Sequence, residues 1–272
     1  MKPVGDRGER GAEPGGPSLA LGFLALVPLI VAHEWGAAVL QRGVVNFAAV
    51  LLALPFAPLG EHALEASWLA YAALAAASLV ALFRADYALV PRLLRVFGEG
   101  ALSAVVLGPL LVFLCWALQL TGEGSALRSA PPAHMPALPW AAVLTGGAAF
   151  EEIVFRLGVL SLFYLAVRRG LLALGARPGA ASPAAELAAL AISALVFAAS
   201  HLDFVVARLA GAGGEPFDGA VFTWRVLAGI LLGILFRWRG MGVAAWAHAL
   251  FGFAFVIGVG LGVFLWCATS SD

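Results

Sequence analysis

Long apolar runs separated by short polar stretches are the main pattern of this chain. Each run provides most or all of the roughly 20 residues that a helix needs to cross a lipid bilayer. The pattern predicts an all-α fold, a polytopic transmembrane helix bundle of about eight helices. The predicted spans cover residues 19–39, 44–60, 64–83, 98–120, 138–167, 186–206, 219–237 and 242–266.

Two of the predicted spans depart from a simple crossing. The second contains Pro55 and Pro58, which interrupt a helix because proline has no backbone N–H to donate. The fifth, 138–167, is longer than one crossing requires, so we expect it to tilt or to begin outside the hydrocarbon.

The first residues of the chain differ from the rest. Residues 1–18 are rich in glycine, proline and charged side chains, a composition that predicts a disordered N-terminal tail. The first apolar run lacks the short basic leader and small-residue cleavage site of a signal peptide, and many spans follow it. We therefore predict a retained first helix and a single transmembrane domain over residues 19–272.

Composition places the pattern in a membrane. The chain is 62% hydrophobic and 12% charged, with a mean hydropathy of +0.97, whereas soluble domains are about 45–50% apolar and about 25% charged. An integral membrane protein is predicted. The 16 basic residues equal the 16 acidic ones, so no overall field favours nucleic acid. Cys115 and Cys267 form neither a disulfide framework nor a paired metal motif.

Arginine is unevenly distributed over the two sides of the predicted bundle. If all eight spans cross the membrane, one side collects Arg42, Arg84, Arg92, Arg95, Arg168, Arg169, Arg177, Arg237 and Arg239. Basic loops tend to stay in the cytoplasm. This distribution predicts that both termini lie outside the cytoplasm.

Three ionisable residues lie inside the fifth predicted span: Glu151, Glu152 and Arg156. Burying such a group in a bilayer costs on the order of 3 kcal/mol, so these groups normally face the bundle interior and mark a functional site. Glu152 and Arg156 are spaced i,i+4 and can pair on one helix face, whereas Glu151 is turned by about 100°. The pair alone could be a structural link, but the unpaired acid favours function.

Two histidines lie in later spans. His201 follows the apolar part of the sixth span, where a lone histidine is more often a structural residue near the interface. His248 lies in an apolar stretch with no charged group between Met241 and Trp266. An imidazole at that depth needs a partner from another helix.

One glutamate and two histidines on three separate helices form a set that can activate water. Glu151 would act as general base on a water that attacks a peptide carbonyl, and a histidine would help to bind that water or the developing oxyanion. The same residues, Glu151, His201 and His248, also match a Glu/His/His set that ligates catalytic zinc.

The order Glu-Glu-x-x-x-Arg, Phe-x-x-x-His and a late His resembles the CAAX protease and bacteriocin-processing family (CPBP, or Abi) of intramembrane proteases. The motif residues fall on Glu151, Glu152, Arg156, Phe197, His201 and His248. The resemblance covers about residues 140–255 and indicates a protease-like core at about 138–266. The first four spans match the family only in being apolar.

The resemblance implies an eight-helix bundle with a cavity open to one side and cleavage of a membrane-associated substrate near its end. It implies that Glu151 activates water, His201 assists it, and His248 helps to bind the oxyanion, while Glu152 with Arg156 orders the site. It also implies a glutamic mechanism without a cofactor. Zinc held by Glu151, His201 and His248 is the minority alternative.

One position departs from the family pattern. Family members commonly carry Asn four residues after the last histidine, where this chain has Gly252. Asn46 is the only asparagine of the chain and belongs to a distant helix, so we expect no obvious side-chain amide for the oxyanion. Loss of one such donor typically lowers the rate about 100- to 1000-fold.

The leading hypothesis is an intramembrane endopeptidase that hydrolyses a peptide bond in a membrane-associated protein or peptide, during peptide maturation or C-terminal processing and sorting. We expect it in a bacterial inner (cytoplasmic) membrane, with its substrate and the lipid bilayer as partners and no nucleic acid. The alternative, favoured by Gly252, is a non-catalytic scaffold or bacteriocin self-immunity protein. Proton-coupled transport would also use buried Glu and His, but no internal repeat is visible.

Overall fold

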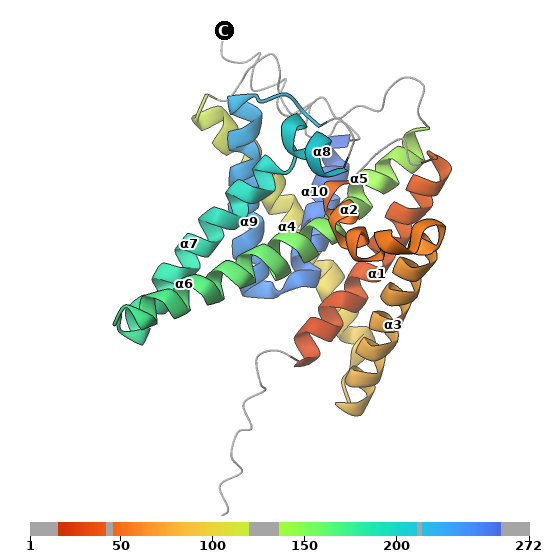
Figure 1. Ribbon diagram of the computed structural model, residues 1–272, viewed down its shortest axis with the longest axis horizontal. Helices are drawn as coiled ribbons and strands as arrows, with labels where there is room; N and C mark the ends of the chain where they lie inside the picture. Colours follow the sequence, from red (N-terminus) through yellow and green to blue (C-terminus); the bar gives the residue numbers. More distant parts are fainter. Residues whose placement is uncertain (1–15, 42–45, 120–135, 211–213, 257–272) are drawn as a thin grey trace, which may run out of the picture.

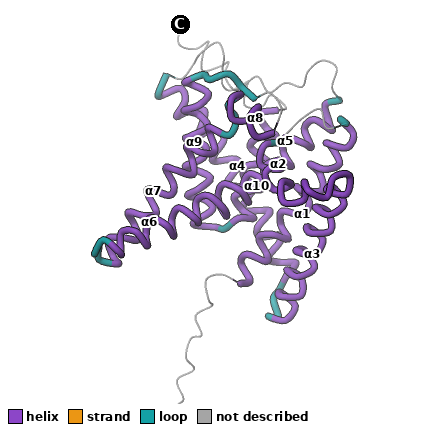
Figure 2. The backbone as a smooth tube through the Cα atoms, in the orientation of Figure 1, coloured by secondary structure: helices purple, strands orange, loops and turns teal. Residues whose placement is uncertain are grey.

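The described fold is helical almost throughout (Figure 1). The computed structural model describes residues 16–41, 46–119, 136–210 and 214–256. Within these ranges there is no β-strand, and short loops join the helices (Figure 2). The prediction of an all-α transmembrane bundle is confirmed. Most of the predicted tail, and the predicted last span beyond Val256, lie outside the described residues.

Ten α-helices follow one another along these ranges. They are α1 (Gly16–Val39), α2 (Phe47–Ala53), α3 (Ala63–Arg84), α4 (Leu89–Ala117), α5 (Ala137–Glu151), α6 (Ser161–Ala173), α7 (Pro178–Ala199), α8 (Asp203–Ala210), α9 (Gly219–Arg239) and α10 (Met241–Val256). A 3₁₀ segment, η1 (Leu54–His62), lies between α2 and α3, and a π segment, η2 (Glu152–Leu160), lies between α5 and α6.

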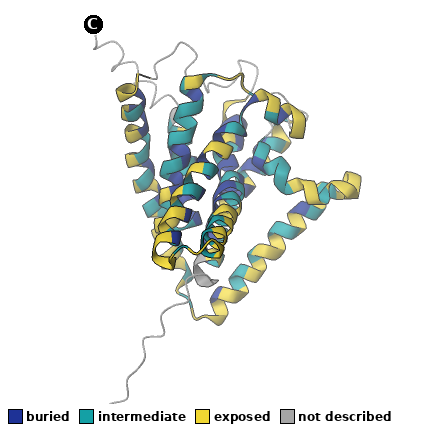
Figure 3. Cartoon of the chain, turned by 60° about the vertical axis from the view of Figure 1, so that its left-hand side comes forward, coloured by how far each residue is buried: buried dark blue, intermediate teal, exposed yellow. Residues whose placement is uncertain are grey.

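Lipid-facing surfaces identify the chain as an integral membrane protein. Among the described residues, five segments are long and apolar enough to cross a bilayer: Leu19–Val39, Phe47–Arg84, Leu89–Ala117, Pro178–Ala199 and Gly219–Arg239. Exposed positions lie on the outer faces of the bundle, and buried positions lie between the helices (Figure 3). On α4, the apolar side chains of Leu102 and Val105 are 67% and 70% exposed, which suits contact with lipid chains.

The second predicted span is not one helix. α2 has seven residues, a length of about 10 Å at 1.5 Å per residue. The 3₁₀ segment after it contains Pro55 and Pro58, and Gly60 adopts φ 59°, a left-handed conformation that glycine adopts readily. The prolines remove the donors that a longer α-helix would need. The chain therefore changes direction here before α3 begins.

This break changes the predicted orientation. Leu21 near the start of α1 and Tyr87 between α3 and α4 line the same cavity, so the first turns of α1 lie at the end of the bundle where α3 ends. Arg84 is at that end, and Arg42 lies outside the described residues. The predicted placement of the N-terminal side opposite the arginine-rich end is therefore wrong, because it required a crossing between residues 44 and 60.

The fifth predicted span is a continuous helical stretch with a π segment in its middle. α5 passes directly into η2 and η2 into α6. The Ser161 hydroxyl donates to the Arg156 carbonyl (3.2 Å), and the Ser193 hydroxyl of α7 donates to the Phe155 carbonyl (2.7 Å). Side chains thus satisfy carbonyls in these wide turns. π segments are rare and occur frequently at functional sites, and this one begins directly after Glu151.

Close contact with α1 fixes α5 in the centre of the bundle. Gly146 of α5 lies so near the backbone of Leu29 and His33 that a Cβ atom would clash. The ring of His33 donates from Nδ1 to the Val143 carbonyl (3.0 Å) and packs edge-on against Phe150, with centroids 4.9 Å apart. These contacts hold the end of α5, and thus the start of the π segment, against α1.

Candidate active site

A buried charge pair lies in the π segment. Glu152 and Arg156 are 0% and 1% exposed, and Arg156 Nε lies 3.3 Å from Glu152 Oε2. The pair is held by charge, since the contact lacks hydrogen-bond geometry and the Arg156 terminal nitrogens have no hydrogen-bond partner among the described residues. The guanidinium instead lies 4.5 Å from the Phe197 ring centroid. An aromatic face attracts a cation at this distance.

His248 of α10 lies between the two carboxylates. Its Nδ1 is 3.0 Å from Glu152 Oε1, and its Nε2 is 3.6 Å from Glu151 Oε2. A carboxylate accepts hydrogen bonds, so Nδ1 donates to Glu152 Oε1, whereas Nε2 faces Glu151 Oε2 at a longer distance. The ring of Phe251 stacks on His248 with centroids 5.5 Å apart. The imidazole is thereby fixed in orientation.

Glu151 points away from the buried charge pair, as expected for adjacent residues on a helix. Its Oε1 accepts a hydrogen bond from Asn46 Nδ2 (2.9 Å), and its Oε2 faces His248. The side chain is 15% exposed, compared with 0% for Glu152. Glu151 is therefore the more accessible of the two carboxylates and the better placed to contact a reacting water.

Asn46 is a residue of the site that the sequence analysis excluded as distant. It is the N-cap of α2, where its Oδ1 accepts a hydrogen bond from the Ala49 amide (3.0 Å). That bond orients the side chain and turns Nδ2 towards Glu151. The prediction that this asparagine lies far from the catalytic groups is wrong. The signal in the sequence was a helix-capping residue before an apolar run.

Gly147 makes room for the asparagine. A Cβ atom at position 147 would lie 2.6 Å from Asn46 Nδ2, closer than two such atoms can approach. Position 147 lies four residues before Glu151, on the same side of the helix. The contact between α2 and Glu151 therefore depends on the missing side chain at this position.

His201 lies just beyond the end of α7. Its Nδ1 is 2.9 Å from the Phe197 carbonyl, so Nδ1 donates and Nε2 is the acceptor of the neutral ring. It interacts electrostatically with Glu151. The His201 carbonyl accepts from the Glu215 amide (2.9 Å), which ties this turn to the start of α9.

Phe197 connects the separate parts of the site. Besides the guanidinium, its ring packs edge-on against His201 (5.0 Å between centroids) and His248 (5.9 Å). It is 3% exposed. The i,i+4 spacing of Phe197 and His201 places them on one helix face, so one aromatic ring fixes both imidazoles and the arginine.

The predicted residues thus come together in one region of the bundle. Glu151, Glu152 and Arg156 are joined directly or through His248, and His201 reaches the group through Phe197. Their roles in a reaction stay predictions. The alternative zinc set does not form a ligand cluster: no group of three or more His, Cys, Asp or Glu side chains in the described part of the chain has metal-binding geometry.

Gly252 lies one turn after His248 in α10. A Cβ atom there would meet no atom of the other described residues within 4 Å. The space in which the resemblance places an asparagine side chain is thus open, and the amide nearest to Glu151 comes from α2 instead.

Comparison with known families agrees with this geometry. Residues 133–254 match the family described as type II CAAX prenyl endopeptidase Rce1-like. The matched segment includes Glu151, Glu152, Arg156, His201 and His248, whereas Asn46 lies outside it. No curated protein and no solved structure matches the chain. The resemblance to CAAX proteases is confirmed.

Proposed function

Because residues 133–254 belong to the Rce1-like family of CAAX proteases, we propose that the protein is a glutamic-type intramembrane endopeptidase. It hydrolyses a peptide bond in a membrane-associated protein or peptide by means of a water molecule that Glu151 activates. The observation that carries this proposal is the different environment of two adjacent glutamates. Glu152 is fully buried in an ion pair with Arg156, whereas Glu151 is partly exposed and faces the imidazole of His248.

The first chemical step uses Glu151 as the general base. Its carboxylate takes a proton from water while the water oxygen forms a bond to the carbonyl carbon of the substrate, giving a tetrahedral oxyanion. His248 Nε2, which lies 3.6 Å from Glu151 Oε2, can orient the water or, when protonated, donate to the oxyanion. The acceptor Nε2 of His201 can accept a hydrogen bond from the water. A preorganised donor at that oxyanion is worth several kcal/mol in a water-poor site.

The second step breaks the peptide bond. The oxyanion re-forms the carbonyl, the C–N bond breaks, and the proton held by Glu151 passes to the departing amine. The products are a carboxylic acid and an amine, and Glu151 returns to its charged form. The reaction changes no oxidation state, and Glu151 carries the proton from the water to the departing amine.

The remaining polar residues hold these groups in position. Glu152 fixes His248 through Nδ1 and is itself held by Arg156. Asn46 restrains Glu151 by a hydrogen bond to Oε1, which leaves Oε2 for the water. Such restraint matters because a misplacement of about 1 Å can cost about 100-fold in rate.

The proposal also includes a cellular setting. We place the protein in the inner (cytoplasmic) membrane of a bacterium, where its reaction would serve peptide maturation or C-terminal processing and sorting of proteins. The candidate site lies within a bundle that carries five candidate membrane spans among the described residues, so we expect a membrane-associated substrate. Nucleic acid is not a partner.

Comparison of the protein termini in the membrane and secreted proteomes of the host tests the proposal. The strains carry the intact protein, a deletion, Glu151→Gln, or the control Glu186→Gln, which changes an exposed carboxylate on α7 that pairs with Arg237. We expect the same termini to disappear in the deletion and Glu151→Gln strains and to persist in the control. The amount of each variant in the membrane is measured by immunoblot.

A second function is favoured by Gly252, which stands where the family resemblance implies an asparagine amide. A protein with a decayed site would act as a non-catalytic scaffold or as a self-immunity factor against a bacteriocin. In that case Glu151→Gln would fully restore whatever the deletion impairs, and the protease proposal would be wrong.

A further inference from the structure

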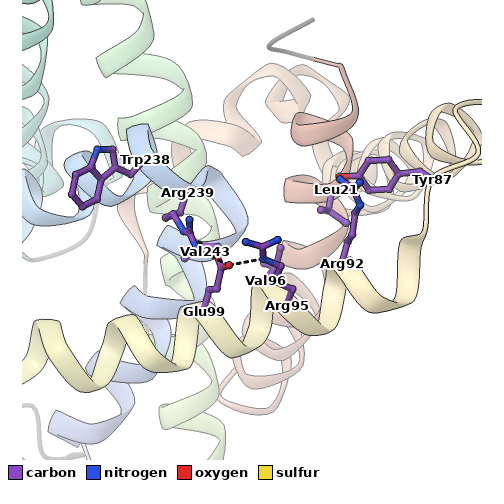
Figure 4. A pocket seen from close by; sticks show the side chains of 9 residues that line it. All are labelled: Leu21, Tyr87, Arg92, Arg95, Val96, Glu99, Trp238, Arg239 and Val243. Carbon is purple, nitrogen blue, oxygen red and sulfur yellow. Dashed lines mark hydrogen bonds and ion pairs between the residues drawn. The ribbon is translucent and has the colours of Figure 1, made fainter. Parts of the chain in front are cut away.

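A cavity with charged side chains in its lining lies at the arginine-rich end of the bundle (Figure 4). None of its lining residues belongs to the candidate active site. Its volume is about 380 Å³. Residues from four parts of the chain line it: the first turns of α1, the α3–α4 connection with the first half of α4, the end of α9, and the start of α10. Chain segments from both halves of the protein therefore form its wall.

The cavity carries an excess of positive charge. Arg92, Arg95 and Arg239 line it, against the single acid Glu99, whereas the whole chain is neutral. An ion pair between α4 and α9 would need only one arginine for this glutamate. The two further guanidinium groups are more than such a structural link requires.

Glu99 holds two of the arginines in place. It receives Arg95 Nε at 2.7 Å and Arg239 Nη2 at 2.6 Å on Oε1, and Arg239 Nε at 3.0 Å on Oε2. Figure 4 shows these side chains meeting between α4 and the end of α9. Each guanidinium has five N–H donors, so both retain donors for a ligand after this pairing.

The third arginine is oriented by a tyrosine. Arg92 Nη1 donates to Tyr87 Oη (2.9 Å), and its guanidinium carbon lies 4.1 Å from the centre of the Tyr87 ring. Arg92 thus lines the cavity beside Tyr87, and Arg239 lines it beside Glu99 (Figure 4). Planar guanidinium groups fixed around one space match the geometry of a phosphate.

The position of the cavity near the ends of candidate membrane spans favours a lipid phosphate as its ligand. Three candidate spans, those of α1, α4 and α9, have an end near it. Trp238, which also lines it, is 82% exposed, as expected for an aromatic residue at the headgroup level. Leu21, Val96 and Val243 give the cavity an apolar wall. A phospholipid presents its phosphate at this depth, with apolar chains beside it.

We propose that this cavity binds the phosphate of an anionic phospholipid headgroup. The site differs from the proposed catalytic one in residues and chemistry, and the proposal does not depend on proteolysis. Basic residues next to transmembrane helices attract anionic lipids, each contributing a factor of about five in affinity near the surface. Loss of two arginines should therefore weaken binding roughly 30-fold.

The test uses the full-length protein purified with its lipids and reconstituted in phosphatidylcholine nanodiscs, with or without phosphatidylglycerol. Native mass spectrometry measures retained phosphatidylglycerol, and thermal unfolding measures the stabilisation that it gives. The variant is Arg92→Gln/Arg95→Gln. The control, Arg168→Gln/Arg169→Gln on α6, removes the same charge from residues outside the cavity.

We expect the intact protein and the control to retain phosphatidylglycerol, and the cavity variant to lose it. Equal retention by the cavity variant, or equal loss in both double variants, overturns the proposal. If inorganic phosphate alone stabilises the intact protein in neutral lipid and displaces phosphatidylglycerol, the ligand is free phosphate and the lipid assignment is wrong. Arg92→Gln alone leaves the Glu99 pairs intact and gives a folded sample if the double variant fails, with an expected loss of about fivefold.

Discussion

Asn46 makes two hydrogen bonds with different consequences, and its replacement by serine should remove one and keep the other. Oδ1 caps α2 through the Ala49 amide, and Nδ2 donates to Glu151 Oε1. Serine is as good an N-cap as asparagine, but its side chain is too short to reach the glutamate. The Asn46→Ser variant therefore tests the contact with the catalytic carboxylate separately from the stability of α2.

The expected loss can be worked out from the contact. A hydrogen bond to a charged group contributes about 1.5–3 kcal/mol, which corresponds to a decrease of about 10- to 150-fold in kcat/KM if the bond is retained in the transition state. Asn46→Ser should fold like the intact protein. Asn46→Ala should lose activity to a similar degree and also about 1 kcal/mol of stability, because it removes the cap.

Cleavage is assayed in reconstituted membranes with a peptide that spans a junction identified by the comparison of termini, and stability is measured by thermal unfolding in the same lipid. A decrease in kcat with little change in KM is expected, since Asn46 contacts the enzyme's base and not the substrate. Wild-type turnover by Asn46→Ser, combined with a lower melting temperature for Asn46→Ala, would show that Asn46 is only a helix cap.

Three further substitutions test other contacts of the site. Arg156→Gln leaves the fully buried Glu152 carboxylate without its ion partner and should lower the free energy of unfolding by about 3–5 kcal/mol. The control Arg237→Gln, in a half-exposed ion pair, should lower it by only ~1 kcal/mol. Equal losses in thermal unfolding would contradict the argument from burial. Gly147→Ala should displace the Asn46 amide and lower cleavage at least tenfold. The control Gly170→Ala, whose added Cβ meets no described atom within 4 Å, should cleave normally and stabilise its helix by up to about 1 kcal/mol. Equal cleavage by both variants would refute the close contact at Gly147. Gly252→Asn adds an amide in open space one turn after the last histidine and should raise turnover about tenfold; unchanged or lower turnover would show that the site lacks no donor there.

The site residues that lie within predicted membrane spans could be predicted from the sequence alone. Charged groups are so costly in hydrocarbon that their presence in the fifth span was itself informative. The i,i+4 relation of Glu152 and Arg156 also follows from helix geometry alone, and the pair forms as expected. Periodicity and burial cost are local properties, so these features can be read along the chain.

The errors arose where the path of the chain in space decides the outcome. The hydropathy of residues 44–60 resembles that of a span, but two prolines and a left-handed glycine turn the chain before it can cross. Asn46 reaches Glu151 for the same reason, because the short α2 lies beside α5 instead of crossing the membrane away from it. The π segment was also not predictable, since its wide turns depend on contacts such as the Ser193 hydroxyl with the Phe155 carbonyl.

The contact between Asn46 and Glu151 also determines how much of the chain the chemistry requires. The segment that matches the protease family, residues 133–254, contains both glutamates and both histidines but neither Asn46 nor α1. Yet α1 holds α5 through His33, and α2 supplies the hydrogen bond that restrains the catalytic carboxylate. A general base gains its efficiency from fixed geometry. If Glu151 is the base, as proposed, the N-terminal helices are part of the catalytic apparatus, and variation in them should alter turnover as directly as variation in the matched segment does.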